Sequence, residues 1–296
     1  MRLAPHGGGE FSGISVSCGL QPRYAPYDTY VMAQHALDEA IRNSIAVGAD
    51  PDQVAVIDNF CWPDPLPSEK NPDAQYKLAQ LVRACAGLKD LAKIYGTPFV
   101  SGKDSMKNDF IGKSRFGKEV KISVLPTVLV TAMGKVHDVR KVVSSDFKNE
   151  GDKIFLLGIN KRALGGSELF EKFTLPKEKI LNALNLVEPE ENLKIYRALH
   201  KAIQNELLES CHDCSEGGML VALTESAIGG GLGIKADFEN IADAFKKFTG
   251  SMLEFFFNES AGRFIVSVKA ENLTAFTKAF QGLPCISFGE VTKSPI

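Results

Sequence analysis

Residues 101–108 read Ser-Gly-Lys-Asp-Ser-Met-Lys-Asn and bring together a glycine, a cation, a carboxylate and a hydroxyl. Gly102 would let the backbone turn and approach a ligand closely, and Lys103 offers a point charge to phosphate. Asp104 can meet a hard cation and Ser105 can donate a hydrogen bond. The pattern predicts a polyanion site at the exit of a short apolar strand. The alternative is an exposed loop, because loops are made of the same residue types.

A second group could hold a metal ion. Glu39 and Asn43 are four residues apart in a segment, 28–47, whose apolar residues recur at helical spacing. A carboxylate and an amide so spaced point the same way, and both oxygens could reach one Mg²⁺. The alternative is a solvated helix face with a local hydrogen bond.

Two more groups are polar and stand at expected element boundaries. Asp58, followed by Asn59, ends a predicted strand over 53–57 that we expect to neighbour the strand of Lys103. The alternative is a turn-forming pair. Asp213 precedes Ser215, the expected N-cap of a helix over 216–228.

Two glycines, 217 and 218, follow that serine and would leave the first amides of the helix open to an anion. A plain cap needs only the serine. The additional aspartate and glycines favour a metal-phosphate role over the plain cap.

Composition excludes several classes of protein. The 296 residues are 44% hydrophobic and 24% charged, as in a globular protein that is long enough for two domains. A formal charge of −2 without basic clusters argues against a nucleic-acid partner. We find no apolar stretch long enough for a signal or a membrane span, so we expect a cytoplasmic protein.

The cysteines and histidines give weak signals. Six scattered cysteines are typical of reduced thiols, and the Cys211-x-x-Cys214 pair leaves a thioredoxin-like redox role as a minor alternative. We interpret His35, His137 and His200 as surface residues and assign them no role.

Residues 1–13 are rich in glycine and have no periodicity, so we expect a start outside the fold, frayed or appended. A charged, loop-like stretch over 137–152 marks a boundary between a domain over 14–145 and another over 150–296. In helix 74–95 we expect an inner face made of Leu78, Leu81, Val82, Cys85, Leu88, Leu91 and Ala92. The other expected helices are 28–47, 189–209, 216–228 and 273–280. The expected strands are 14–18, 53–57, 98–100, 123–135, 153–158, 252–257, 263–269 and 285–289.

The order of these motifs resembles that in phosphoribosylformylglycinamidine synthase (FGAM synthase), an amidotransferase of purine biosynthesis. The likeness is to the second of the two homologous halves of its synthetase region and covers about residues 19–291, including Asp38-Glu39-Ala40-Ile41-Arg42-Asn43 and Phe257-Asn258-Glu259-Ser260. It implies the α+β (mixed α/β) fold of the aminoimidazole ribonucleotide synthetase-like superfamily. There, a barrel-forming α/β domain precedes a C-terminal α+β domain.

The resemblance also implies roles for residues. Mg²⁺ and ATP or ADP are the implied cofactors. The implied magnesium ligands are Glu39, Asn43 and Asp213, the nucleotide contacts are Asp58, Gly102 and Ser215, and Ser105 contacts the ribonucleotide substrate. We add Lys103 to the nucleotide contacts because its charge can meet phosphate, although some members of the family have a metal-binding asparagine at this position. The family's Glu-Thr-His stretch with its catalytic histidine is absent, so the catalytic residue is unknown.

In that family, ATP phosphorylates the amide oxygen of formylglycinamide ribonucleotide, and ammonia from glutamine then displaces the phosphate. We expect this chain to be a fragment that binds Mg-nucleotide and is inactive alone. Its partners would be the missing first half and a glutaminase domain or subunit, or a second copy through the N-terminal domain. Alternatives are a stand-alone homodimeric synthetase or kinase of the superfamily and a non-catalytic structural nucleotide-binding module.

Overall fold

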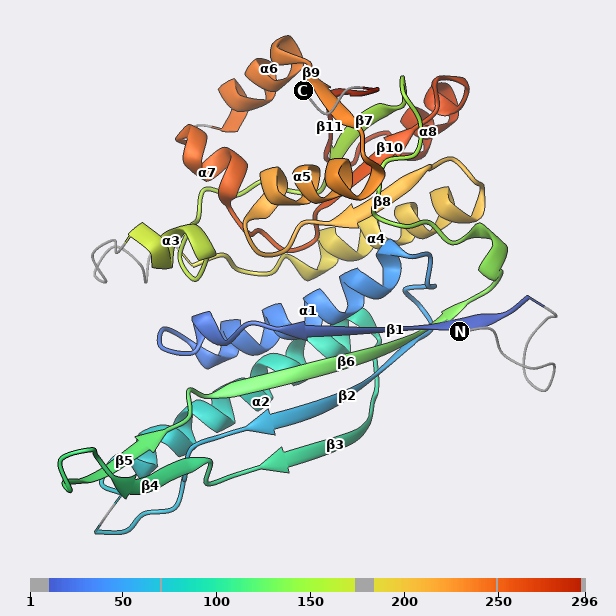
Figure 1. The fold of residues 1–296 in the computed structure, drawn as a ribbon. Coiled ribbons are helices and arrows are strands. Elements are labelled where there is room, and N and C mark those ends of the chain that lie inside the picture. The colour runs from blue at the N-terminus through green and yellow to red at the C-terminus, as the bar shows by residue number, and fades with distance from the viewer. Residues whose placement is uncertain (1–10, 70, 174–183, 249, 294–296) are drawn as a thin grey trace.

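The computed structural model describes residues 11–69, 71–173, 184–248 and 250–293. These form two units, each built on its own sheet, and Figure 1 shows them stacked with helix α1 (Thr29–Ala46) at their junction. Residues 1–10 of the expected frayed start lie outside the described part. Strand β1 (Gly13–Leu20) begins at Gly13, so the described residues place the last residue of that expected start inside the fold.

The first sheet has the order β1-β6-β2-β3. Strand β6 runs antiparallel to both neighbours, whereas β2 and β3 are parallel because helix α2 crosses between them. Helices α1 and α2 pack against one face of this sheet. The bounds are β6 (Thr127–Val136), β2 (Val54–Cys61), β3 (Phe99–Ser105) and α2 (Ala74–Tyr95).

The pairing of β2 with β3 confirms that these strands are neighbours, with Asp58 opposite Gly102 and Asn59 opposite Lys103. However, the prediction that these residues follow the strand ends is wrong. The ladders continue to Cys61 on β2, so the polar residues stay extended inside the sheet.

The expected single strand over 123–135 is also wrong, since Pro126 cannot donate to a ladder. The chain breaks there into β6 and a preceding strand β5 (Glu119–Ser123), which pairs with β4 (Asp109–Lys113).

Helix α2 has the predicted bounds and ends at Gly96, whose φ of 67° is the left-handed C-cap conformation. The predicted inner face was too wide: the side chains of Leu78 and Val82 are 46% and 62% exposed. The contact with α1 instead uses a small residue. A Cβ on Gly87 would lie 2.4 Å from the carbonyl oxygen of Tyr30.

The second sheet has the order β8-β10-β7-β11-β9 and is antiparallel throughout. Apolar side chains cover both of its faces and form two cores. One lies under α4 and α8, the other under α5, α6 and α7. The bounds are β7 (Lys153–Leu157), α3 (Glu168–Phe173), α4 (Pro189–Gln204), β8 (Ser210–Asp213), α5 (Gly218–Gly230), β9 (Gly233–Ala236), α6 (Phe238–Phe248), α7 (Met252–Phe257), β10 (Phe264–Val268), α8 (Leu273–Ala279) and β11 (Cys285–Thr292). Short 3₁₀ turns are Pro22–Tyr24, Val139–Lys141 and Ala270–Asn272.

Two predictions fail in this unit. The segment predicted as a strand over 252–257 is helix α7, which a capping box between Ser251 and Glu254 starts. Helix α5 begins at Gly218 with Gly217 as its N-cap, so Ser215 is not the cap. The hydroxyl of Ser215 donates to Asp213 instead. No helix in the described part is long and apolar enough to cross a membrane.

Candidate functional site

A buried charge network joins the two units. Asp38 on α1 is fully buried and accepts four hydrogen bonds. One comes from Arg42 on the same helix (2.6 Å) and one from Tyr95 on α2 (2.5 Å). The other two come from α4, from Tyr196 (2.7 Å) and Asn192 (3.2 Å). One carboxylate therefore holds three helices together across the junction.

Arg42 carries this network to the predicted metal ligand Asp213. Its Nε donates to Asp213 Oδ2 (3.2 Å) and its Nη2 donates to Ser215 Oγ (2.9 Å). Burial raises the pKa of the Asp213 carboxyl, but His212, Arg42 and Ser215 together lower it to about 2. Asp213 is therefore a fixed, ionised carboxylate at neutral pH.

Glu39 comes close to Asp213 although they belong to different units. Glu39 Oε2 accepts the backbone N–H of Leu20 (2.8 Å) and Nε2 of Gln21 (3.1 Å). Burial raises the pKa of Glu39, and the negative charge of Asp213 raises it further. Asn43 donates to the carbonyl of Cys18 (3.2 Å), which leaves its side-chain oxygen for another partner.

A separate group forms where β2 and β3 face α2. A Cβ on Gly102 would lie 2.8 Å from both carboxylate oxygens of Asp58, so this glycine permits close approach and does not form a turn. Burial and the charge of Asp104 raise the pKa of Asp58. A cavity of about 750 Å³ opens here, with Lys89 and Lys93 in its lining.

The structure divides the 101–108 segment between two faces of the sheet. Gly102 and Asp104 face α2, whereas Lys103 and Ser105 alternate to the opposite face, where Lys103 Nζ donates to Ser105 Oγ. Sequence proximity suggested one binding loop. The extended backbone of β3 prevents these four side chains from converging.

Glu259 was missed by the sequence reasoning and occupies the predicted anion site. It is 7% exposed, and its Oε1 accepts the N–H groups of Gly217 (2.8 Å) and Glu168 (2.9 Å). Burial raises the pKa of Glu259 to about 7, although these two hydrogen bonds lower it. An internal carboxylate thus uses the amide of Gly217 that was predicted for a ligand.

One further prediction was wrong, and one minor alternative is contradicted by burial. His35 is buried, stacks on Tyr24 at 4.5 Å and contacts the carbonyl of Asn185 (2.7 Å), so it is not a surface residue. Cys211 and Cys214 are both buried, and burial raises both thiol pKa values, that of Cys214 to about 11. A redox pair needs a lowered pKa and exposure.

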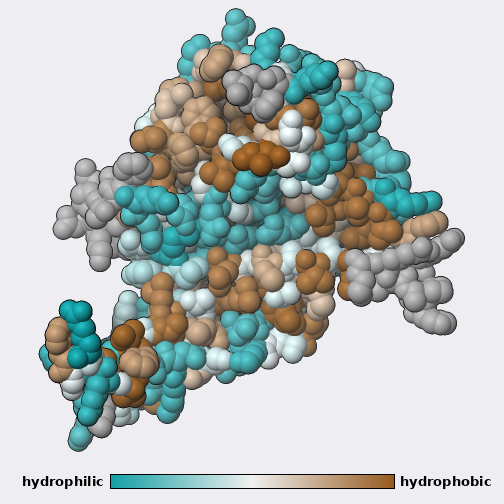
Figure 2. Space-filling model, in the orientation of Figure 1, coloured by the Kyte–Doolittle hydropathy of each residue, from teal (hydrophilic) through white to brown (hydrophobic). Residues whose placement is uncertain are grey.

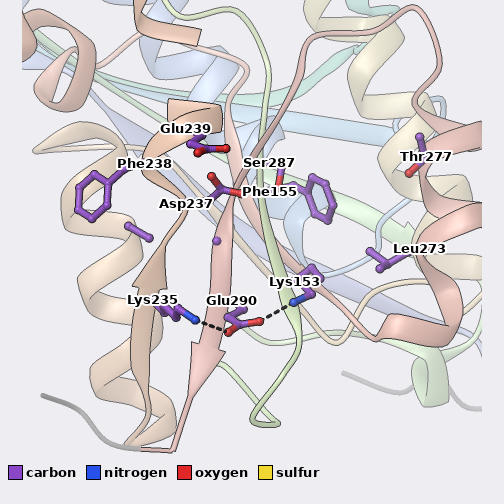
Figure 3. A pocket seen from close by; sticks show the side chains of 12 residues that line it. Lys153, Phe155, Lys235, Asp237, Phe238, Glu239, Leu273, Thr277, Ser287 and Glu290 are labelled. Atoms are coloured by element: carbon purple, nitrogen blue, oxygen red, sulfur yellow. Dashed lines mark hydrogen bonds and ion pairs between the residues drawn. The ribbon is translucent and has the colours of Figure 1, made fainter. Parts of the chain in front are cut away.

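Two other cavities differ in the residues that line them. One of about 480 Å³ is lined by Asp213, Ser215 and Gly217. Another, of about 630 Å³ and shown in Figure 3, contains none of the predicted site residues. Its two lysines, Lys153 and Lys235, both approach Glu290 (2.5 and 3.6 Å). Because Glu290 offsets their charge, this cavity is less suited to a polyanion.

The two stacked sheets and the carboxylates at their junction define a two-domain protein of the aminoimidazole ribonucleotide (AIR) synthase-like class. Residues 10–136 match "AIR synthase related protein, N-terminal domain", and residues 149–296 match the corresponding C-terminal domain. The chain belongs to the AIR synthase related protein family. This result confirms the fold predicted from the sequence.

Among curated proteins, the chain is 34% identical over 268 residues to phosphoribosylformylglycinamidine synthase subunit PurL of Thermococcus sibiricus. The match covers 90% of this chain but 34% of the relative, so the chain spans about a third of that protein's length.

Solved structures show the same fold. T. maritima PurL complexed with FGAR superposes with a TM-score of 0.71 at 19% identity, covering 96% of this chain and 42% of that one. The same protein complexed with ATP superposes with a TM-score of 0.70 at 17% identity, and the match covers 99% of this chain and 44% of that one. The hydrogenase maturation protein HypE in complex with ATP superposes with a TM-score of 0.63 at 13% identity, and the match covers 99% of this chain and 79% of that one.

Proposed function

We propose that this chain is the second synthetase half of an FGAM synthase, the ATP-dependent carbon–nitrogen ligase that converts formylglycinamide ribonucleotide to its amidine with ammonia from glutamine. The 34% identity to a PurL subunit supports this function. We further propose that the chain binds Mg-nucleotide, is inactive alone and acts in the cytoplasm.

One observation carries the nucleotide part of the proposal, namely the approach of Glu39 and Asp213 from different units. Asp213 is ionised, and its charge together with burial disfavours the ionised form of Glu39. The amide oxygen of Asn43 is available because its amide nitrogen donates to Cys18. Hard oxygen donors in this arrangement fit Mg²⁺. When bound, Mg²⁺ would offset the negative charge of nucleotide phosphates. Arg42 and Ser215 keep the Asp213 carboxylate in place.

The alternation along β3 supports two different contacts for the 101–108 segment. We assign Gly102, with Asp58, to the nucleotide on the helix-facing side. We assign Ser105 to the ribonucleotide substrate on the open side, where the charge of Lys103 would meet phosphate. Ser215 completes the proposed nucleotide contacts.

The proposed partners are the first synthetase half and a glutaminase domain or subunit. A structure of PurLQS from Thermotoga maritima, with a TM-score of 0.69, shares the fold. A second candidate function is a homodimeric ATP-using synthetase or kinase. It is favoured by the HypE match, which covers 79% of that shorter relative.

The binding proposal is tested by thermal unfolding of the purified chain with Mg-ADP. At about 100 times the dissociation constant, the nucleotide should add ~2.7 kcal/mol to the unfolding free energy. We expect Asp213→Asn and Glu39→Gln to lose this stabilisation. Glu290→Gln, a carboxylate in the cavity of Figure 3, should keep it. Absence of a shift in the unsubstituted chain would contradict the proposal.

Turnover separates the candidates. The chain is assayed with ATP, formylglycinamide ribonucleotide and ammonia, alone and with a first synthetase half. Activity only with the added half supports our proposal. Robust activity of the chain alone supports the homodimeric enzyme, and nucleotide binding without activity in either assay supports a structural module.

A further inference from the structure

Three metal-ligating side chains converge at the junction of the two units, outside the proposed nucleotide site. Asp50 follows α1, His137 follows β6 and His200 lies in α4. One donor atom from each lies within 4.8 Å of the other two. Residues far apart in sequence thus supply two imidazoles and one carboxylate to a single point.

Asp50 is already oriented as a ligand would be. Its Oδ2 contacts His137 Nε2 (2.8 Å) and accepts from Gln53 Nε2 (3.1 Å), and its Oδ1 accepts the N–H of Asp52 (3.0 Å). Burial raises the pKa of this carboxyl, but the bonds from His137 and Asp52 outweigh it and the pKa is lowered. Outer hydrogen bonds of this kind fix the direction of metal-binding carboxylates.

His200 supplies the feature that a simple His–Asp ion pair does not explain. Its Nδ1 is buried and has no hydrogen-bond partner among the described residues. The His137 and His200 rings lie 5.8 Å apart, and His200 is close enough to Asp50 to influence its pKa. An unpaired buried ring nitrogen is costly, and imidazole is a common metal ligand.

We propose that Asp50, His137 and His200 bind a divalent transition-metal ion of the Zn²⁺ type. Two imidazoles and one carboxylate match zinc in its three-ligand sites, whereas Mg²⁺ takes oxygen ligands. Ligand bonds of about 2.1 Å in a tetrahedral site place donor atoms about 3.4 Å apart. An ion would therefore open the His137–Asp50 pair from 2.8 Å to about 3.4 Å, and it would draw the His200 donor, which lies within 4.8 Å of both, to the same spacing.

The position of this site gives it a structural consequence. Asp50 and His137 belong to the first unit and His200 to the second. A bound ion therefore links the two units next to the Asp52–Arg197 ion pair, which already crosses the same junction.

The test uses the full chain, stripped with a chelator and titrated with Co²⁺ alone, whose visible absorption reports nitrogen and oxygen ligation. We expect one site with nitrogen ligands, from which Zn²⁺ displaces Co²⁺. His137→Gln and His200→Gln should each weaken binding by at least about tenfold. Because the His137 side chain is 39% exposed, its variant should fold normally, which circular dichroism checks.

His212→Gln is the matched control, since His212 also pairs with a carboxylate, Glu225, at 2.9 Å. It should bind Co²⁺ as the unsubstituted chain does, and Zn²⁺ should raise the melting temperature of both. The proposal is overturned by absence of binding, or by binding that is lost in His212→Gln and kept in His200→Gln.

Discussion

At the residue scale, Gly102 shows how one missing methyl group shapes a site. Its absent Cβ leaves room for the Asp58 carboxylate, which lies against β3 beside Asp104. The two carboxylates therefore share one face, where burial and the charge of Asp104 make Asp58 harder to ionise. The glycine is needed for this approach and not for a turn.

We predict that Gly102→Ala will destabilise the chain by about 1 kcal/mol, because the new Cβ displaces the Asp58 carboxylate. The proposed nucleotide contact of Asp58 should weaken as well. Urea unfolding and Mg-ADP titration measure the two effects. Ser101→Ala, at an exposed neighbouring position, is the control. Equal stability of the two variants would show that Asp58 can move freely.

Glu259 predicts a pH dependence of stability. Burial raises its pKa from 4.5 to about 7, and Arg23 (3.6 Å) and the charges of Glu168 and Glu216 surround it. A carboxyl that is harder to ionise in the folded state stabilises the fold fully below pH 4.5. This contribution is lost as the pH rises to about 7.

We expect the unfolding free energy to fall by up to about 3 kcal/mol across that interval through this group. Glu259→Gln should flatten the profile, because an amide can still accept both N–H bonds and does not ionise. Urea unfolding from pH 4.5 to pH 8 tests this, with exposed Glu191→Gln as control. An unchanged slope in Glu259→Gln would refute the assignment.

At the element scale, helix α1 acts as the joint between the two units. Its one polar stripe contains Asp38, Glu39, Arg42 and Asn43, and it contacts β1, α2, α4 and β8 through them. The buried Arg42 lies between two carboxylates, Asp38 and Asp213, and their charges outweigh burial and raise its pKa. Packing of the units and placement of Asp213 thus depend on one side chain.

We predict that Arg42→Met will cost about 3–5 kcal/mol of stability, because it leaves two buried carboxylates without their cation. Arg197→Met is the matched control. Its ion pair with Asp52 also crosses the junction but is half exposed, so its loss should cost at most about 1 kcal/mol. Equal losses, measured by urea unfolding, would mean that the buried network has no special role.

At the scale of the whole molecule, the first sheet has an open face. Figure 2 shows hydrophobic side chains gathered over it, on the side away from α1 and α2. Alternation along β1 and β6 places Val16 (63% exposed), Leu20 (40% exposed) and Leu129 there. The edge strands β1 and β3 each lack a second neighbour within the described sheet. Such a face favours pairing with a homologous half or a second copy.

We predict that the isolated chain self-associates through this face. Val16→Asp should shift the mass measured by light scattering toward the monomer, because it introduces charge into the apolar patch. Val82→Asp, at an equally exposed position on α2, should not. A monomeric unsubstituted chain at tens of micromolar would contradict self-association and leave the first synthetase half as the proposed occupant.

Sequence periodicity correctly predicted those helices and strands whose apolar spacing and end signals lie within the element itself. Helix α2 was correctly bounded because its apolar spacing and Gly96 are local signals. The helix at 252–257 was missed, since its apolar run gives no period and its start depends on the Ser251–Glu254 capping box. The charged residues of α1 form part of a sequence motif, but their buried partners Tyr95, Asn192, Tyr196 and Asp213 lie on distant elements.

The sequence alone determined the fold family, the neighbouring strands β2 and β3 and the residue types available for chemistry, because these depend on local pattern and motif order. Only the tertiary structure decided which of those residues meet. It separated Gly102 from Lys103 by the pleat of a strand, brought Glu39 to Asp213 across two units and placed Glu259 on the Gly217 amide. Such meetings depend on how distant elements pack, which short-range spacing does not encode.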